Sequence, residues 1–401
     1  MLLFPLALVG IWNATPTAAA QEIGISGFIK TSYYYDTNQI PAVREGDFVL
    51  YPIFVDDGTG ENDESAEQDN LLFVPFFSRL TFSVGDLPEA LGAKTTGYLE
   101  GDFYGPGNAT NNTYRIRRAF VKLDWATHEV LFGMDWTPLF LSSWARTVAT
   151  EAGAPFNPFA RHVMAKLVLK PESFRLTGIL SQQRDAFAEI GGLKQQQQSG
   201  LPGAMLGLEY VGEGGTNVGL NAYYKWIRPG LTTDRFGSGA VQAYANLITE
   251  GLEARGNVTF GGDLADHLLT GGYAVLTDGT NVEFVPLNTV AAWLDLQTRG
   301  DLSVGIFGGY SQSLGTAEDD ARGRLVEFVA RGYGDTPIQN VWRVSPRVTY
   351  TSGKVRIGAE VQATGAAYVV GGDIYDESLA PDGDTENVVN IRGNLSVFLF
   401  F

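Results

Sequence analysis

The stretch from Val389 to Phe401 alternates strictly between apolar and polar residues, and it restricts the possible folds more than any other part of the sequence. A period of two places the two sets on opposite faces of a β-strand, one apolar and the other polar and in contact with water. The apolar set comprises Val389, Ile391, Gly393, Leu395, Val397, Leu399 and Phe401, and the other set begins with Asn390, Arg392, Asn394 and Ser396.

This strand ends on Phe400 and Phe401, and aromatic residues suit the boundary between a membrane and water. We therefore expect the last strand of a transmembrane β-barrel, which pairs with the first strand to close the ring. The alternative is an edge strand of a soluble sandwich. It is less favoured because natural proteins seldom leave a long hydrophobic edge exposed.

The start of the sequence has features of a secretory signal peptide. An apolar run over residues 2–11 is followed by Ala18, Ala19 and Ala20, although the usual basic residues before the run are missing. We interpret residues 1–20 as a signal peptide and residues 21–401 as one domain; a start further upstream or a weak signal are the alternatives. Beyond Ala20, no segment approaches the roughly 18 apolar residues of a membrane-spanning helix, so a membrane-spanning form would need strands.

Composition supports strands and excludes some classes of function. The 49 glycines and 12% aromatic residues favour strands joined by tight turns. The absence of cysteine excludes disulfide and thiolate–metal frameworks. The net charge of −17 argues against a nucleic-acid partner, which would require a basic face.

Alternating segments recur along the whole chain, and the connections between them are long and short in turn. This regularity predicts an all-β fold, a sixteen-stranded antiparallel transmembrane β-barrel with long extracellular loops and short periplasmic turns. A propeller or stacked sandwich would not sort its connections in this way, and the sequence shows no repeat of propeller length.

The polar phase of such strands would line a water-filled lumen. Basic residues outnumber acidic ones on this phase, which predicts a preference for anions, because Arg and Lys attract carboxylate and phosphate groups and donate hydrogen bonds to them. We expect Glu100 and Asp102 to lie beside Arg118 and Lys122 on the next strand. The alternative is that such ion pairs only make the water-facing side of the barrel wall more rigid. The predicted pore-lining residues are Lys30, Arg79, Glu100, Asp102, Arg118, Lys122, Arg343, Arg347, Arg356 and Arg392. The same phase carries Lys166, Lys225, Arg255, Lys354, Asp295 and Glu360.

The long connection 137–160 is rich in proline and aromatic residues, and we expect it to fold inward as a constriction. Arg146 and Glu151 are its charged candidates for contact with a solute. An outward cap or a latch between subunits is the alternative. Acidic loops at 56–69, 318–320 and 373–386 account for the net charge and are expected to be solvated.

The sequence offers little for catalysis. Its three histidines, His128, His162 and His267, lack the spacing of a zinc site and are expected to lie apart. No nucleophile elbow, phosphate-binding loop or dinucleotide fingerprint is present. We therefore predict no enzyme activity, no catalytic residue, no metal and no cofactor.

Six short segments carry a resemblance to a known family: Gly27–Thr31, Gly92–Phe103, Arg115–Leu123, Gly153–Phe156, Arg343–Arg347 and Ser352–Val355. They resemble DcaP-like trimeric porins of Gram-negative outer membranes. The resemblance implies a sixteen-stranded barrel, a homotrimer, and a third long loop folded into the lumen.

We therefore predict an outer-membrane porin for passive diffusion of small hydrophilic solutes, favouring anions that bear carboxylate or phosphate. Its expected partners are those solutes, outer-membrane lipid and further copies of itself. The alternative is a non-conducting surface barrel that acts as an adhesin or structural protein through its long loops. A sixteen-stranded barrel is wide enough for an aqueous channel, which favours the porin.

Overall fold

The computed structural model describes residues 22–41, 43–56, 61–105, 107–184 and 193–401. The predicted signal peptide, residues 1–20, lies outside the described residues. The strands are β1 (Glu22–Asp36), β2 (Asn70–Val74), β3 (Arg79–Gly85), β4 (Lys94–Asp102), β5 (Arg115–Asp124), β6 (His128–Trp136), β7 (Arg161–Leu169), β8 (Phe174–Gln183), β9 (Gly203–Val211), β10 (Asn217–Ile227), β11 (Phe236–Ile248), β12 (Leu252–Gly262), β13 (Gly271–Thr277), β14 (Val282–Thr298), β15 (Leu302–Gly315), β16 (Leu325–Arg331), β17 (Ile338–Ser352), β18 (Val355–Gly371) and β19 (Asp384–Phe400). The helices are α1 (Pro138–Leu141), α2 (Leu193–Ser199) and α3 (Ala321–Arg324), and short 3-10 turns occur at η1 (Val43–Gly46), η2 (Asn108–Thr110), η3 (Glu213–Gly215) and η4 (Ala265–His267).

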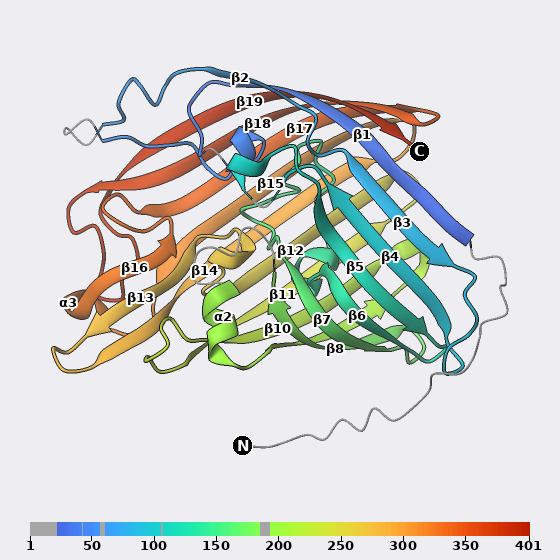
Figure 1. The fold of residues 1–401 in the computed structure, drawn as a ribbon. Helices are drawn as coiled ribbons and strands as arrows, with labels where there is room; N and C mark the ends of the chain where they lie inside the picture. Colours follow the sequence, from blue (N-terminus) through green and yellow to red (C-terminus); the bar gives the residue numbers. More distant parts are fainter. Residues whose placement is uncertain (1–21, 42, 57–60, 106, 185–192) are drawn as a thin grey trace.

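Within the described residues, sixteen antiparallel barrel strands close into a ring (Figure 1). β2 and β3 pair with different halves of β1 and together make one barrel strand. β13 and β16 stand outside the ring, because β12 pairs directly with β14 and β15 pairs directly with β17. The predicted sixteen-stranded antiparallel barrel is confirmed.

The first and last strands close the ring as expected. β1 pairs with β19 from Phe28 opposite Phe400 to Asp36 opposite Arg392. At the far end of this seam, Asp36 and Arg392 form a buried ion pair, with Nη2 and Oδ2 2.7 Å apart. The amide of Asn390 also donates to Asp36 at 2.7 Å.

The wall has an apolar outer face and a polar inner face. On β19, Ile391, Leu395 and Leu399 are exposed, whereas Arg392 and Asn394 between them are buried. An apolar exterior with all strand edges paired is what a bilayer requires, because lipid offers no hydrogen bonds to the backbone. None of the helices in the described part of the chain is long and apolar enough to cross a membrane.

The barrel strand made by β2 and β3 is interrupted at Pro75. Proline has no backbone N–H to donate to a neighbouring strand, so residues 70–84 cannot form one unbroken strand with full pairing. The backbone N–H of Lys30, which faces the break, donates instead to Ser78 Oγ at 3.0 Å.

A bulge in β5 changes which residues face the lumen. The pairing of β4 with β5 shifts between Glu100, opposite Arg118, and Gly101, opposite Ile116. Arg117 is the extra residue, and a bulge of this kind lets two consecutive side chains point the same way. Both Arg117 and Arg118 therefore reach carboxylates on the inner face of the wall.

A three-stranded sheet extends beyond the barrel at the end with the long loops (Figure 1). It consists of β13, the first half of β14, and β16. β13 and β16 thus lie within the long connections 261–288 and 312–340 between barrel strands. β13 is buried on both faces, so it lacks the alternation that marks the barrel strands.

Three chain segments fill part of the lumen: 43–54, 137–160 and 263–269. One side chain from each of them, Phe48, Phe159 and Leu268, belongs to a single buried cluster. The rings of Phe48 and Phe159 are 5.6 Å apart, edge to face. The interior at this level is packed like the core of a soluble protein.

Segment 263–269 is held to the wall by one lysine between two carboxylates. Lys225 Nζ on β10 lies 3.2 Å from Asp263 and 3.0 Å from Asp266, and all three side chains are buried. Burial and the charge of Asp266 raise the pKa of Asp263 to about 7, against the attraction of Lys225. Lys225 and His267 instead hold the pKa of Asp266 below its usual range, against the effect of burial, so Asp263 is the group of this cluster that titrates near neutral pH.

We expect Asp263→Asn to gain stability relative to the wild type as the pH rises from about 4 to about 8. The pKa of Asp263 is raised from 3.8 to about 7 on folding, so its protonated form favours the folded state at low pH. That contribution is lost as the pH rises through about 7, and asparagine cannot lose it. The measurement is the free energy of unfolding by urea, in detergent, at several pH values. If the difference in free energy of unfolding between the variant and the wild type did not change with pH, the raised pKa of Asp263 would be contradicted.

We expect Asp36→Asn to lower the free energy of unfolding by about 3–5 kcal/mol, because it leaves the buried guanidinium of Arg392 without its counter-charge. Arg322→Gln is the control, since Arg322 pairs with Asp373 and Glu377 on the surface, where solvent screens the pair and its loss should change stability little. Urea unfolding followed by tryptophan fluorescence measures both. Equal effects of the two substitutions would show that the seam does not depend on the ion pair.

Candidate functional site

Segment 137–160 contacts the inner wall opposite its own strands. The backbone N–H groups of Val148 and Ala149 donate to Glu360 on β18, at 2.6 and 2.8 Å. Glu151 accepts from Arg343 on β17 at 3.2 Å. A carboxylate that bonds two consecutive amides holds the backbone itself in place, so these contacts set the path of the segment across the lumen.

Segment 43–54 is held by the same part of the wall through its carbonyl groups. Arg392 donates to the carbonyls of Gly46, at 2.6 Å, and Asp47, at 3.1 Å. Arg343 donates to the carbonyl of Val49 at 2.6 Å. Burial raises the pKa of the Asp47 carboxyl, although Lys30 and Arg392 oppose this.

A hollow of about 390 Å³ lies inside the barrel beside segment 137–160, and we call it the basic vestibule. Its wall includes the final residues of β19 and the second residue of β18, so it lies toward the end with the short turns. Five basic side chains and one carboxylate contribute to it, together with aromatic rings. The charged residues are Lys30, Arg79, Arg117, Arg118, Arg356 and Glu100, and the aromatic ones include Phe28, Phe77, Phe398 and Phe400.

Aromatic rings and loop carbonyls hold the cations of the vestibule in place. Lys30 Nζ donates to the carbonyl of Val148 at 3.0 Å and to Thr150 Oγ1 at 2.9 Å. It also lies 5.2 Å from the ring centre of Phe77, a cation–π distance. The guanidinium of Arg79 lies 4.9 Å from the same ring.

The carboxylates of β4 have different partners from those expected. Glu100 pairs with Arg117 at 3.1 Å and, more loosely, with Arg79 at 3.6 Å. Asp102 pairs with Arg115 at 2.7 Å and with Arg117 at 2.5 Å. The bulge in β5 explains this change, because it brings Arg117 between the two carboxylates.

The two basic residues that we expected beside these carboxylates are bound elsewhere. Arg118 pairs with Asp135 on β6 at 2.6 Å. Lys122 lies opposite Thr96, several residues along β4, and its nearest carboxylate is Asp124 at 3.9 Å. Arg118 therefore lies opposite Glu100 as expected, although its ion pair is with Asp135, whereas the expected position of Lys122 beside these carboxylates is wrong.

Three further predicted pore-lining residues are buried outside the vestibule. Arg343 contacts both lumen segments, Arg392 bonds Asp36 and segment 43–54, and Arg347 forms a bidentate pair with Asp295, both bonds 2.8 Å long. Arg356, in contrast, is exposed at the vestibule.

The two charged candidates of segment 137–160 differ in their access to solvent. Glu151 is fully buried, where it bonds Arg343 and Gln362. Arg146 is partly exposed and lies 3.3 Å from Glu253 on β12. Partial burial and the nearby Arg255 lower the pKa of Arg146, against the pull of Glu253.

Two histidines meet inside the barrel, so the expectation that all three lie apart is wrong. The rings of His162 and His267 are 5.5 Å apart. His162 Nδ1 lies 3.0 Å from Ser181 Oγ, and His267 Nδ1 lies 2.8 Å from Asp266. All these side chains are buried. Among the described residues, no three His, Asp or Glu side chains are placed to hold a metal ion.

The alternation of apolar and polar residues in β5 did not predict that Arg117 faces the lumen, where it bridges Glu100 and Asp102. Strict alternation from Arg118 places Arg117 on the lipid side. The signal was nevertheless present, because two adjacent arginines cannot both satisfy alternation without exposing one of them to lipid.

The sequence matches no protein-family model and no curated protein. The structure, however, resembles solved membrane channels over nearly its whole length. It matches the outer membrane channel DcaP of Acinetobacter baumannii with a TM-score of 0.72 and 14% identity, over 95% of this chain and 97% of that one.

Two further structures show the same fold at lower similarity. The anion-selective porin from Comamonas acidovorans matches with a TM-score of 0.56 and 11% identity, over 95% of this chain and all of that one. The trimer form of OmpT, an outer membrane protein of Vibrio cholerae, matches with a TM-score of 0.50 and 13% identity, over 96% of this chain and all of that one. The chain therefore has the sixteen-stranded fold of outer-membrane porins, as its resemblance to the DcaP-like porins implies.

Proposed function

We propose that this protein is an outer-membrane porin through which small hydrophilic solutes diffuse passively, and that it favours anions bearing carboxylate or phosphate. The observation that carries the proposal is the basic vestibule. Arg117 and Arg118 are paired with Asp102 and Asp135, so Lys30, Arg79 and Arg356 supply an excess of positive charge over Glu100. An excess of fixed positive charge inside a narrow lumen attracts anions and repels cations before any contact forms.

The apolar outer face of the barrel supports its placement in a membrane, and the fold supports a channel. On β19, for example, Ile391, Leu395 and Leu399 are exposed on the outer face, as lipid requires. The anion-selective porin from Comamonas acidovorans shows that this fold can carry such a preference.

Segments 43–54 and 137–160 narrow the bore in this proposal. Arg343 and Arg392 act as supports for these segments, because both are buried and bond to backbone carbonyls. Arg146 is then the residue of segment 137–160 that meets a passing solute, since Glu151 is enclosed. The basic residues of the vestibule attract the anion into the lumen.

The proposal includes a homotrimer and no catalysis. The trimer form of OmpT supports the homotrimer. The absence of catalysis is supported by the burial of Ser181 and His162, because a substrate cannot reach the serine hydroxyl.

A non-conducting surface barrel is the second candidate function. The dense packing of three segments in the lumen and the sheet of β13, β14 and β16 favour it.

We expect stepwise conductance from the purified protein in a planar bilayer. In a salt gradient, the reversal potential should take the sign of an anion-preferring pore, because the vestibule carries an excess of positive charge. A cation preference would refute the role of the vestibule. Protein that is folded and inserted but does not conduct would favour the surface barrel.

We expect Arg356→Gln to lower the anion-to-cation permeability ratio by roughly twofold to fivefold, since a unit charge about 4 Å away in water is worth about 1 kcal/mol. Arg356 is exposed at the vestibule, so the substitution should leave folding intact. Arg299→Gln is the control, because Arg299 is an exposed arginine next to a short turn that does not line the vestibule. An equal effect of both would assign the preference to the general surface charge.

A further inference from the structure

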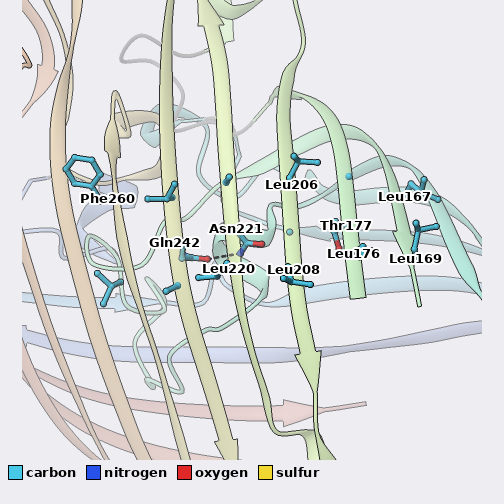
Figure 2. A pocket seen from close by; sticks show the side chains of 16 residues that line it. Leu167, Leu169, Leu176, Thr177, Leu206, Leu208, Leu220, Asn221, Gln242 and Phe260 are labelled. Carbon is cyan, nitrogen blue, oxygen red and sulfur yellow. Dashed lines mark hydrogen bonds between the residues drawn. The ribbon is translucent and has the colours of Figure 1, made fainter. Parts of the chain in front are cut away.

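One hollow of the described chain lies on its lipid-facing wall, not in its lumen. It measures about 810 Å³ and runs across the outer faces of β7 to β12 (Figure 2). Leucine side chains stand along its margins, whereas its floor is formed by small outward residues on neighbouring strands. These are Gly178 on β8, Ala222 on β10 and Ala243 on β11.

A second hollow, of about 450 Å³, continues the first toward the extracellular end. The two share Leu206, Ala222, Val241 and Phe260, so they form one groove, which we call the outer groove. Its upper part ends where Tyr224 on β10 lies opposite Gly239 on β11.

Two arginines stand directly above the outer groove. The outward phase of β10 runs through Tyr224 and Trp226, and the next residue in that phase is Arg228. The last pair of β10 and β11 joins Ile227 to Phe236, so Arg235 follows on the other strand, beside Arg228. The groove therefore leads to a pair of cations at the extracellular rim.

The surroundings of this pair suit an anionic headgroup. Neither arginine forms an ion pair with any residue that the structure describes, and the buried Nε of Arg228 has no hydrogen-bond partner there. The rings of Tyr224 and Trp226 just below are 4.9 Å apart. Aromatic side chains mark the level of lipid headgroups on a barrel wall.

A comparable hollow elsewhere on the wall lacks these cations. It measures about 560 Å³, lies across β1 and β17 to β19, and has Gly393 in its lining. The chain near its extracellular end carries Asp69 on one side and Asp384 and Glu386 on the other. These three carboxylates would repel an anionic lipid, whereas the rim of the outer groove has two arginines and one carboxylate, Asp234. The net charge at the rim therefore distinguishes the two hollows.

We propose that the outer groove is a binding site for a phosphate-bearing, acylated lipid of the outer leaflet. Its acyl chains lie over Gly178, Ala222 and Ala243, and its phosphate lies between Arg228 and Arg235. Arginine donates paired hydrogen bonds to phosphate oxygens, and basic residues at a membrane surface bind anionic lipids. The inference rests on the outer-membrane placement of the proposed function but not on conduction.

The first test is a titration of the purified protein in detergent with lipid A, followed by native mass spectrometry. We expect one tightly bound lipid A per chain, no comparable binding of diacylglycerol, and no competition by inorganic phosphate. The double variant Arg228→Gln/Arg235→Gln should weaken binding roughly tenfold or more, since each basic residue contributes about fivefold. Its control is Arg299→Gln/Lys354→Gln, which removes two charges near the short turns.

The second test fills the groove. An added Cβ meets nothing within 4 Å at Gly178, and its nearest neighbour at Gly393 is 4.0 Å away, so leucine fits both sites without disturbing the wall. Gly178→Leu should weaken lipid A binding, whereas Gly393→Leu in the other hollow should not. Conductance through both variants should match that of the wild type.

Three outcomes would overturn the inference. Equal binding by all variants would mean that lipid A only coats the wall. A loss in the arginine variant without a loss in Gly178→Leu would mean that the groove holds no acyl chain. Competition by inorganic phosphate would mean a free-anion site. Absence of conductance in the wild type would count against the porin alone, because lipid binding is measured without it.

Discussion

Every backbone N–H and C=O in the wall has to find a partner within the protein, because lipid offers none. The pairing of β1 with β19 meets this requirement by removing the two free edges of the sheet. Asp36 and Arg392 lie at one end of that seam, and Arg392 also reaches segment 43–54. The same contact therefore closes the ring and holds part of the lumen filling.

Charged residues in the lumen have two different tasks in this structure. Arg343, Arg347 and Arg392 are enclosed and bond to carboxylates and carbonyls, so they act as internal supports. Arg356 and Arg79 line the basic vestibule and keep some contact with open space. In the proposed channel only residues of the second kind meet a solute, and counting basic residues along the strands cannot separate the two kinds.

The alternation of apolar and polar residues was enough to predict the barrel, because one period repeats along nearly every strand. It failed where the backbone departs from that period: at Pro75, at the bulge beside Arg117, and in β13, which is buried on both faces. The packing of segments 43–54 and 263–269 was not predicted either. Their contacts join residues far apart in the sequence, and no local pattern encodes such pairs.

Arg343 bonds Val49 in one lumen segment and both Glu151 and Ala154 in another. One guanidinium therefore links two loops that otherwise belong to different parts of the chain. A displacement of either loop must therefore break its bonds to Arg343 or move the other loop with it. The two segments therefore share one position across the lumen, which neither can change without the other.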